Sequence, residues 1–398
     1  MGSTCEVSQS IEAKLKSTRP RARPPLSLYI HFPWCVKKCP YCDFNSYETS
    51  GDSLENEYVA ALKADLKAES ELLGNRTNLH SIFMGGGTPS LFSAGAITKV
   101  LLMISDLFSI GDDTEITLEA NPGTIDQDKF RGYFTAGVNR LSIGVQSFDD
   151  RFLAQLGRIH SANDALDAYS SARQAGFTNI NIDMMHGLPG QTTEDAMQDL
   201  ETAIALQSEH LSWYQLTIEP NTYFYKYPPT LPGEDQIWEM TEAGLALLDN
   251  NGFTRYEVSA FSKPQHQSQH NKNYWTFGDY LGIGAGAHGK ISTTDNNFVI
   301  ERTTKTRSPN DYLVNPNRQS NVVGAGSLAL EFLMNALRLT EGFKQAIFEQ
   351  RTGLGFDQIE SFIQAGISRQ LLEITNDATI RPTDLGMRYL DELLMLLD

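Results

Sequence analysis

The chain has 398 residues, and its composition is that of an ordinary globular protein. Hydrophobic residues make up 40% and aromatic residues 10%, which excludes a wholly disordered chain. The net charge of -17 opposes nonspecific binding to nucleic acid or to an anionic membrane surface, because both need clustered Lys and Arg. This length predicts one large domain with a smaller one.

The sequence contains no apolar run that could span a membrane, so we expect at most peripheral membrane contact. Residues 1–25 lack the apolar core and cleavage-like site of a secretory signal, and their Arg- and Pro-rich end predicts a flexible tail. These features predict a cytoplasmic protein. The oligomeric state does not follow from them.

Six β-rich runs alternate with helical patterns through the first half of the chain. Strands are expected at residues 28–32, 81–84, 115–120, 140–145, 179–184 and 210–217. Helices are expected at residues 54–73, 97–108, 126–135, 162–175 and 193–206. This α/β alternation predicts a parallel sheet with right-handed crossovers, and the periodicity fits a doubly wound sheet and a partial barrel equally well.

Polar or glycine-rich segments follow the first five predicted strands. They are residues 33–45, 85–89, 119–123, 146–147 and 183–190. Parallel α/β folds place their sites at the carboxyl ends of strands, so these segments predict one shared ligand-binding rim.

The pattern changes beyond residue 220. A helix is expected near 236–250, strands near 255–261, a glycine-rich run at 281–289 and a polar linker at 303–326. Residues 327–398 read as a small helical domain of winged-helix type. Residues 321–398 hold eleven acids against six bases, which argues against DNA binding by this domain.

Three of the four cysteines lie within eight positions, with the spacing Cys35-x3-Cys39-x2-Cys42. In a reducing compartment such a group indicates metal binding or catalysis, and Cys5 is expected to be a bystander. Three thiolates on one loop can hold an iron–sulfur cluster with one iron left open. A structural zinc site is the alternative, with His31 or Asp43 as its fourth ligand.

The segment 29–44, YIHFPWCVKKCPYCDF, resembles the cluster loop of radical S-adenosylmethionine (radical SAM) enzymes, in the branch around oxygen-independent coproporphyrinogen III oxidase, HemN. The likeness extends over about residues 26–398. It includes the motifs at residues 85–89, 119–123, 144–147, 156–158 and 181–190. The resemblance implies a partial (β/α)6 barrel over residues 26–302, followed by the linker and the small C-terminal domain.

The resemblance also implies roles for individual residues. Cys35, Cys39 and Cys42 would ligate a 4Fe-4S cluster whose fourth iron takes the amino and carboxylate groups of S-adenosylmethionine. The residues expected to contact this cofactor are Tyr29, Tyr41, Gly86, Gly87, Thr88, Glu119, Gln146, Arg158 and Asp183. On residue type alone, each polar one could equally be a satisfied group at the barrel rim.

Two departures separate the chain from the oxidase. Phe44 stands where the oxidase loop has a further cysteine, and residues 270–275 read H-N-x-x-Y-W, a pattern similar to one that marks the HemW family, described as heme chaperones. The resemblance therefore implies a protein that binds heme and passes it to an acceptor protein, without oxidase activity.

Within the H-N-x-x-Y-W segment His270 is the candidate heme ligand, although it could instead be a hydrogen-bonded histidine under the barrel mouth. His31, His186 and His288 also fall near strand ends. The competing functions are the oxidase reaction and radical chemistry on an unrelated substrate.

Overall fold

The computed structural model describes residues 23–49, 54–293 and 298–397. The predicted tail therefore lies almost wholly outside the described residues. Six parallel strands form the centre of a twelve-stranded sheet, side by side in chain order. They are β1 (Leu26–Phe32), β4 (Asn78–Gly86), β5 (Ser109–Ala120), β6 (Arg140–Gln146), β7 (Ile180–His186) and β8 (His210–Gln215). A doubly wound sheet would reverse its order at a switch point. The unbroken order confirms the partial barrel.

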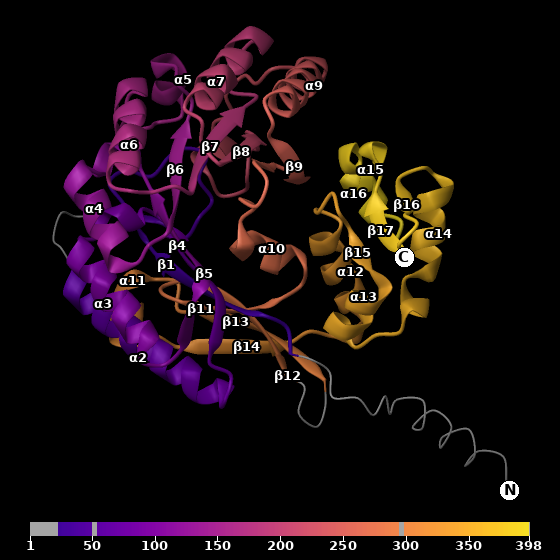
Figure 1. The fold of residues 1–398 in the computed structure, drawn as a ribbon, viewed down its shortest axis with the longest axis horizontal. Coiled ribbons are helices and arrows are strands. Elements are labelled where there is room, and N and C mark those ends of the chain that lie inside the picture. Colours follow the sequence, from indigo (N-terminus) through magenta and orange to yellow (C-terminus); the bar gives the residue numbers. More distant parts are fainter. Residues whose placement is uncertain (1–22, 50–53, 294–297, 398) are drawn as a thin grey trace, which may run out of the picture.

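The crossover helices form an arc outside these strands (Figure 1). They are α2 (Glu55–Leu73), α3 (Ala94–Ser105), α4 (Gln127–Ala136), α5 (Asp150–Gln155), α6 (Ala162–Gln174) and α7 (Thr193–Ala205). Capping boxes at Ser161 and Thr192 satisfy the first free amides of α6 and α7. The sequence therefore marks where both helices begin.

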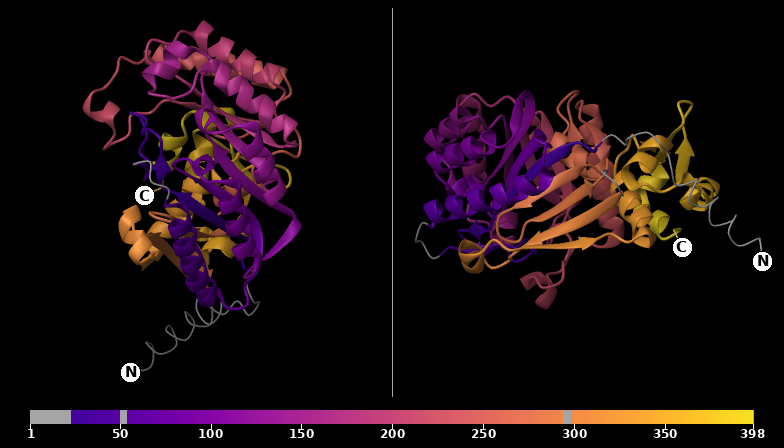
Figure 2. Two further views of the ribbon diagram at one scale, coloured as in Figure 1. Left: turned by 90° about the vertical axis from the view of Figure 1, so that its left-hand side faces the viewer. Right: turned by 90° about the horizontal axis from the view of Figure 1, so that it is seen from below.

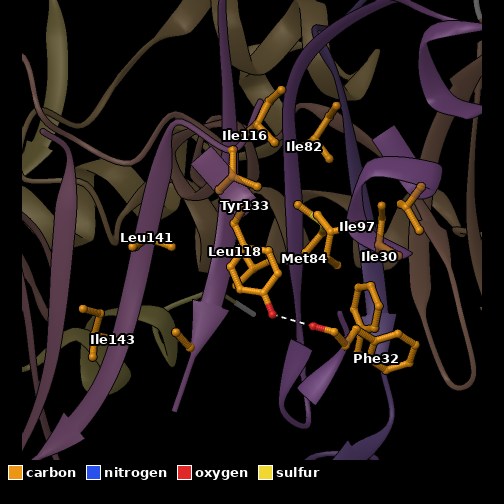
Figure 3. Packing of buried hydrophobic residues seen from close by; sticks show 14 of the residues in the cluster. Ile30, Phe32, Ile82, Met84, Ile97, Ile116, Leu118, Tyr133, Leu141 and Ile143 are labelled. Carbon is orange, nitrogen blue, oxygen red and sulfur yellow. Dashed lines mark hydrogen bonds between the residues drawn. The ribbon is translucent and has the colours of Figure 1, made fainter. Parts of the chain in front are cut away.

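Apolar side chains fill the space between sheet and helices. Ile82, Met84 and Leu118 project from the strands beside Ile97 of α3 and Tyr133 of α4 (Figure 3). The Tyr133 hydroxyl donates to the carbonyl of Phe92 at 2.5 Å, so its polar end is satisfied within the core. This layer is the main hydrophobic core.

The opposite face of the sheet is unusually polar. On β6 and β7 the alternate residues that line cavities are Arg140, Ser142, Gln146, Asn181 and Asp183. Parallel strands are normally apolar on both faces, because helices cover both. A polar inner face instead indicates a chamber built to hold a ligand.

The second half of the chain widens the sheet at both edges. On one edge β11 (Asp279–Ile283) pairs parallel with β1, and β12 (His288–Thr293), β13 (Val299–Lys305) and β14 (Arg318–Val322) follow antiparallel. In the right-hand view of Figure 2 these orange strands run toward the C-terminal domain. On the other edge lie β10 (Ala260–Ser262) and β9 (Thr254–Glu257), preceded by α8 (Tyr223–Lys226) and α9 (Glu234–Asn250).

The prediction of a linker at residues 303–326 is wrong. This stretch contains the end of β13, helix α11 (Pro309–Val314) and β14, which belong to the sheet. The stretch looked like a linker because it is polar. Its buried Lys305, however, binds Asp65 and Glu69 of α2 at 2.5 Å each.

The C-terminal part packs around its own apolar core, which includes Phe332, Phe348 and Phe362. Its helices are α12 (Ala325–Ala336), α13 (Gln345–Thr352), α14 (Glu360–Ser368), α15 (Asp384–Arg388) and α16 (Leu390–Leu394). Its small antiparallel sheet consists of β15 (Phe343–Lys344), β17 (Thr379–Pro382) and β16 (Leu372–Ile374). The helices agree with the predicted small helical domain of winged-helix type, and the domain limits at 327–398 stay a prediction.

Candidate functional site

The three neighbouring cysteines share a cavity of about 370 Å³ beyond the carboxyl ends of the parallel strands. Cys35 lies in β2 (Trp34–Cys35), which pairs with β3 (Tyr47–Glu48), and the amide of Cys42 donates to the carbonyl of Cys39 at 3.1 Å. These contacts fold the loop so that all three thiols, each partly buried, line one cavity.

Burial raises the pKa of the Cys35 and Cys42 thiols. They therefore stay protonated unless a positive centre stabilises the thiolate, as iron does. Within residues 23–49, 54–293 and 298–397, no three His, Cys, Asp or Glu side chains converge on a single ion. An iron–sulfur cluster needs no such convergence, because each thiolate binds a different iron.

The turn after β4 brings backbone close to the cysteine loop. The amides of Gly87 and Thr88 donate to the carbonyls of Phe32 and Trp34, each at 2.7 Å. Gly86 has φ of 110°, and a Cβ on Gly87 would lie 2.6 Å from the Trp34 carbonyl oxygen. Only glycine allows this approach, so the run of glycines is a requirement of the cavity wall.

Two partly buried carboxyls, Glu119 and Asp183, line both this cavity and a second one. Glu119 accepts from the amide of Gly86 at 3.0 Å, and Asp183 accepts from Ser142 and Asn181 at 2.8 Å each. Burial raises the pKa of both, and nearby Asp183 raises that of Glu119 further, to about 8. Both side chains suit hydroxyl groups of a ligand, as donors or acceptors.

Glu119→Gln is expected to flatten the pH dependence of stability. A carboxyl whose folded-state pKa of about 8 exceeds its unfolded value of 4.5 stabilises the protein at low pH, and this stabilisation is lost as pH rises through 8. Cluster-free wild type should therefore lose more thermal stability than the variant between about pH 5 and about pH 9. Parallel melting curves for the two proteins across this range would contradict the assignment.

Arg158 and Gln146 line the same cavity as the glycine turn. Arg158 donates to the Gly144 carbonyl at 2.7 Å and approaches the Cys39 sulfur at 3.6 Å, and its buried Nε has no partner among the described residues. Gln146 has φ of 73°, a backbone conformation that costs about 1–3 kcal/mol for a residue other than glycine. Its side-chain oxygen accepts a hydrogen bond from the Tyr214 hydroxyl at 2.6 Å. The unused Arg158 donor suits a ligand carboxylate.

The second cavity, of about 860 Å³, lies inside the barrel and shares Gly86, Glu119 and Asp183 with the first. Strands β12 to β14 contribute a further wall through His288, Thr304 and Gln319, and Arg307 joins it from the segment after β13. Its volume is in the range of sites for cofactor-sized ligands. The two cavities therefore adjoin and give the site a cysteine end and a barrel end.

His270 lies on α10 (Gln269–Trp275), against the start of β4. Its Nδ1 bonds Ser81 and its Nε2 bonds Tyr274, each at 2.9 Å, and burial lowers its pKa to about 3. The imidazole lines the second cavity with both nitrogens already engaged. This geometry matches the prediction of a hydrogen-bonded histidine more closely than that of an iron ligand.

The other residues of the H-N-x-x-Y-W segment divide between cavity and framework. Tyr274 lines the second cavity, while Asn273 donates to Ser27 at 2.9 Å. Trp275 faces away from the barrel, where the guanidinium of Arg338 lies 4.3 Å from its ring. The motif therefore joins the barrel to the C-terminal domain.

The structure brings the predicted site residues together in these two cavities. The first is lined by Cys35, Cys39, Tyr41, Cys42, Gly86, Gly87, Thr88, Glu119, Gln146, Arg158 and Asp183, and the second by Tyr29 and His270. The sequence analysis missed Arg140, Ser142, His210 and Tyr214, which also line the site. The sequence pattern that could have identified them is the polar residue at every second position of β6 and β8, because alternate residues of a strand lie on the same face.

Comparison with known proteins agrees with this geometry. The Radical SAM superfamily model matches residues 29–203, and the HemN C-terminal domain model matches residues 327–389. "Heme chaperone HemW" of Haemophilus influenzae is 46% identical over 378 residues, covering 94% of this chain and 98% of that protein. The protein of the same name in Escherichia coli is 46% identical over 374 residues, with the same coverage.

The chain belongs to the HemW family. "Heme chaperone HemW" of Bacillus subtilis is also similar to this chain, at 34% identity over 371 residues, covering 90% of this chain and 96% of that protein. HemW proteins are heme-related members of the radical SAM superfamily, which implies a 4Fe-4S cluster and S-adenosylmethionine and so disfavours the zinc alternative.

The solved structure of HemN, coproporphyrinogen III oxidase from Escherichia coli, shares the fold of this HemW-family chain. The TM-score is 0.79 at 23% identity, over 97% of this chain and 93% of that one. The described helices include none that is both apolar enough and long enough to cross a bilayer.

Proposed function

We propose that this HemW-family protein binds heme in its barrel and passes it to an acceptor protein, while its cysteines hold a 4Fe-4S cluster that binds S-adenosylmethionine. The observation that carries the proposal is that the cysteine cavity and the large barrel cavity adjoin and share Glu119 and Asp183 in their walls. One ligand can sit at the cysteines while a larger one fills the barrel beside it.

The donor groups of the first cavity fit the cofactors that the family implies. Cys35, Cys39 and Cys42 would take three irons, and Arg158 would bind the carboxylate of S-adenosylmethionine. The Glu119 and Asp183 carboxyls suit its ribose hydroxyls. When bound, the reduced cluster supplies single electrons to S-adenosylmethionine.

His288 is the histidine of the barrel cavity best placed to bind iron. Four histidines line this cavity. Three of them, His31, His210 and His270, have both ring nitrogens hydrogen-bonded. His288 makes no side-chain hydrogen bond with any residue that the structure describes, and burial, Arg307 and Arg302 lower its pKa. A neutral, unengaged imidazole is the form that ligates heme iron.

His288→Ala is expected to weaken heme binding at least about tenfold and to shift the Soret band, because the iron loses its nitrogen ligand. His270→Ala is the matched control. It should keep the Soret position of the wild type, since its nitrogens serve Ser81 and Tyr274. Anaerobic hemin titration of the three proteins measures both effects. A shifted band in His270→Ala with an unchanged band in His288→Ala would reverse the assignment.

Oxidative decarboxylation of coproporphyrinogen III is the main competing function. Phe44, at the position of the oxidase's further cysteine, lines both cavities and is 56% exposed. We infer that its apolar ring, which has no thiol chemistry, leaves the chain without this activity. Anaerobic incubation with coproporphyrinogen III, a reductant and S-adenosylmethionine tests the inference, and formation of protoporphyrinogen IX would overturn it. A non-porphyrin product would instead indicate radical chemistry on another substrate.

A further inference from the structure

Arg140 is a buried cation in the wall of the barrel cavity. It is the first residue of β6, is 2% exposed and lines the 860 Å³ cavity. Its side chain makes no hydrogen bond within residues 23–49, 54–293 and 298–397, and its Nε is buried without a partner. A buried guanidinium with unused donors is costly unless something in the cavity satisfies them.

Glu115 is the acid nearest to Arg140, and it leaves these donors free. The distance from Arg140 Nε to a Glu115 oxygen is 3.8 Å, which is an ion pair without a hydrogen bond. The Glu115 oxygens instead accept from the amides of Gln269 and His270, each at 3.1 Å. Glu115 therefore partly neutralises the charge of Arg140 while its oxygens accept hydrogen bonds from the first turn of α10.

We infer that Arg140 binds a carboxylate of the ligand in the barrel, which, on the proposed function, is a propionate of heme. Guanidinium groups pair with carboxylates through two parallel hydrogen bonds, and the pairing is strongest where water is excluded. His210, next in the wall, has both nitrogens bonded and a pKa lowered well below its usual value by burial and by Arg140. A neutral neighbour leaves Arg140 as the anchor for an anion at this end of the cavity.

The position of Arg140 separates it from the cofactor end of the site. Arg140 and Gln146 are the first and last residues of β6, so six residue steps of about 3.3 Å place them roughly 20 Å apart along the strand. Arg158, at the Gln146 end, is the candidate for the carboxylate of S-adenosylmethionine. The site therefore has Arg158 at its cysteine end and Arg140 at the far end of β6, each available to a different carboxylate ligand.

The test compares hemin with hemin dimethyl ester, in which both propionates are blocked. Arg140→Gln should weaken hemin binding roughly ten- to hundredfold, the worth of hydrogen bonds to a charged group. It should leave binding of the dimethyl ester unchanged, while Arg140→Lys recovers part of the hemin affinity. Arg131→Gln is the control, because Arg131 of α4 lines neither cavity and its side chain is 61% exposed. It should change hemin affinity less than about threefold.

The outcomes separate the subsite from the proposed function. Equal hemin affinity in wild type and Arg140→Gln would overturn the carboxylate subsite while leaving heme binding intact. An equal loss of hemin and ester would also overturn it, since Arg140 would then only support the fold, and thermal melts would show that loss of stability. Failure of the wild type to bind either porphyrin would overturn the subsite and the proposed function together.

Discussion

Cys39→Ala is expected to abolish assembly of the iron–sulfur cluster. The variant leaves two thiolates for a cluster that needs three from this loop, and the remaining lining of the cavity offers no replacement thiol. Anaerobic reconstitution followed by iron and sulfide analysis measures the effect. The visible absorption of the cluster should disappear from the variant along with its iron.

Cys5→Ala is the matched control for this result. It makes the same chemical change at the remaining cysteine of the chain, which lies outside the described residues. We expect it to bind as much iron as the wild type. Full cluster occupancy in Cys39→Ala, or its loss in Cys5→Ala, would contradict the assignment of ligands.

Lys305→Met is expected to destabilise the protein by about 3–5 kcal/mol, because the buried carboxyls of Asp65 and Glu69 lose their positively charged partner. The side chain of Lys305 is 1% exposed, and its ammonium lies 2.5 Å from carboxylate oxygens of both Asp65 and Glu69. Tyr312 also donates to Asp65 at 2.7 Å, and burial raises the pKa of that carboxyl. Urea unfolding of the cluster-free protein gives the change in the free energy of unfolding.

Lys344→Met makes the same substitution at an exposed ion pair. Lys344 and Asp377 lie 3.1 Å apart, with side chains 56% and 64% exposed, so the loss should stay below about 1 kcal/mol. A similarly small loss for Lys305→Met would show that β13 does not depend on its contact with α2.

The parallel half of the fold could be predicted because each strand and helix carries its own local signal. The strands expected at residues 81–84 and 140–145 lie inside β4 and β6, and Ser161 and Thr192 begin α6 and α7 as sequence rules suggest. Periodicity did not distinguish a barrel from a doubly wound sheet, because strand order depends on long-range pairing. The resemblance to radical SAM enzymes made that choice.

The antiparallel flank could not be predicted in the same way. Strand β14 (Arg318–Val322) is polar and exposed, so it has no hydrophobic alternation, and its pairing with β13 depends on register. Buried Lys305 reads as a surface residue until its partners on α2 are seen. Lysine is so seldom buried without a partner that sequence reasoning places it in solvent.

The candidate site was predictable at its rim and less so in its interior. The cysteines and the glycine turn belong to segments that follow strands, where polar residues attract notice. Arg158 follows α5 and was predicted from the family resemblance. Arg140 begins a strand, so a search of strand ends passes over it. His270 shows the limit of motif reasoning, since the pattern identified the residue but not that Ser81 and Tyr274 occupy both of its nitrogens.

The measurement that tests the central claim most directly is the binding of hemin and S-adenosylmethionine to one anaerobically reconstituted sample. We predict a Soret shift that saturates at one hemin per chain, together with S-adenosylmethionine binding that requires the cluster. A sample that contains the cluster and binds S-adenosylmethionine but shows no stoichiometric Soret shift would contradict the proposed heme function.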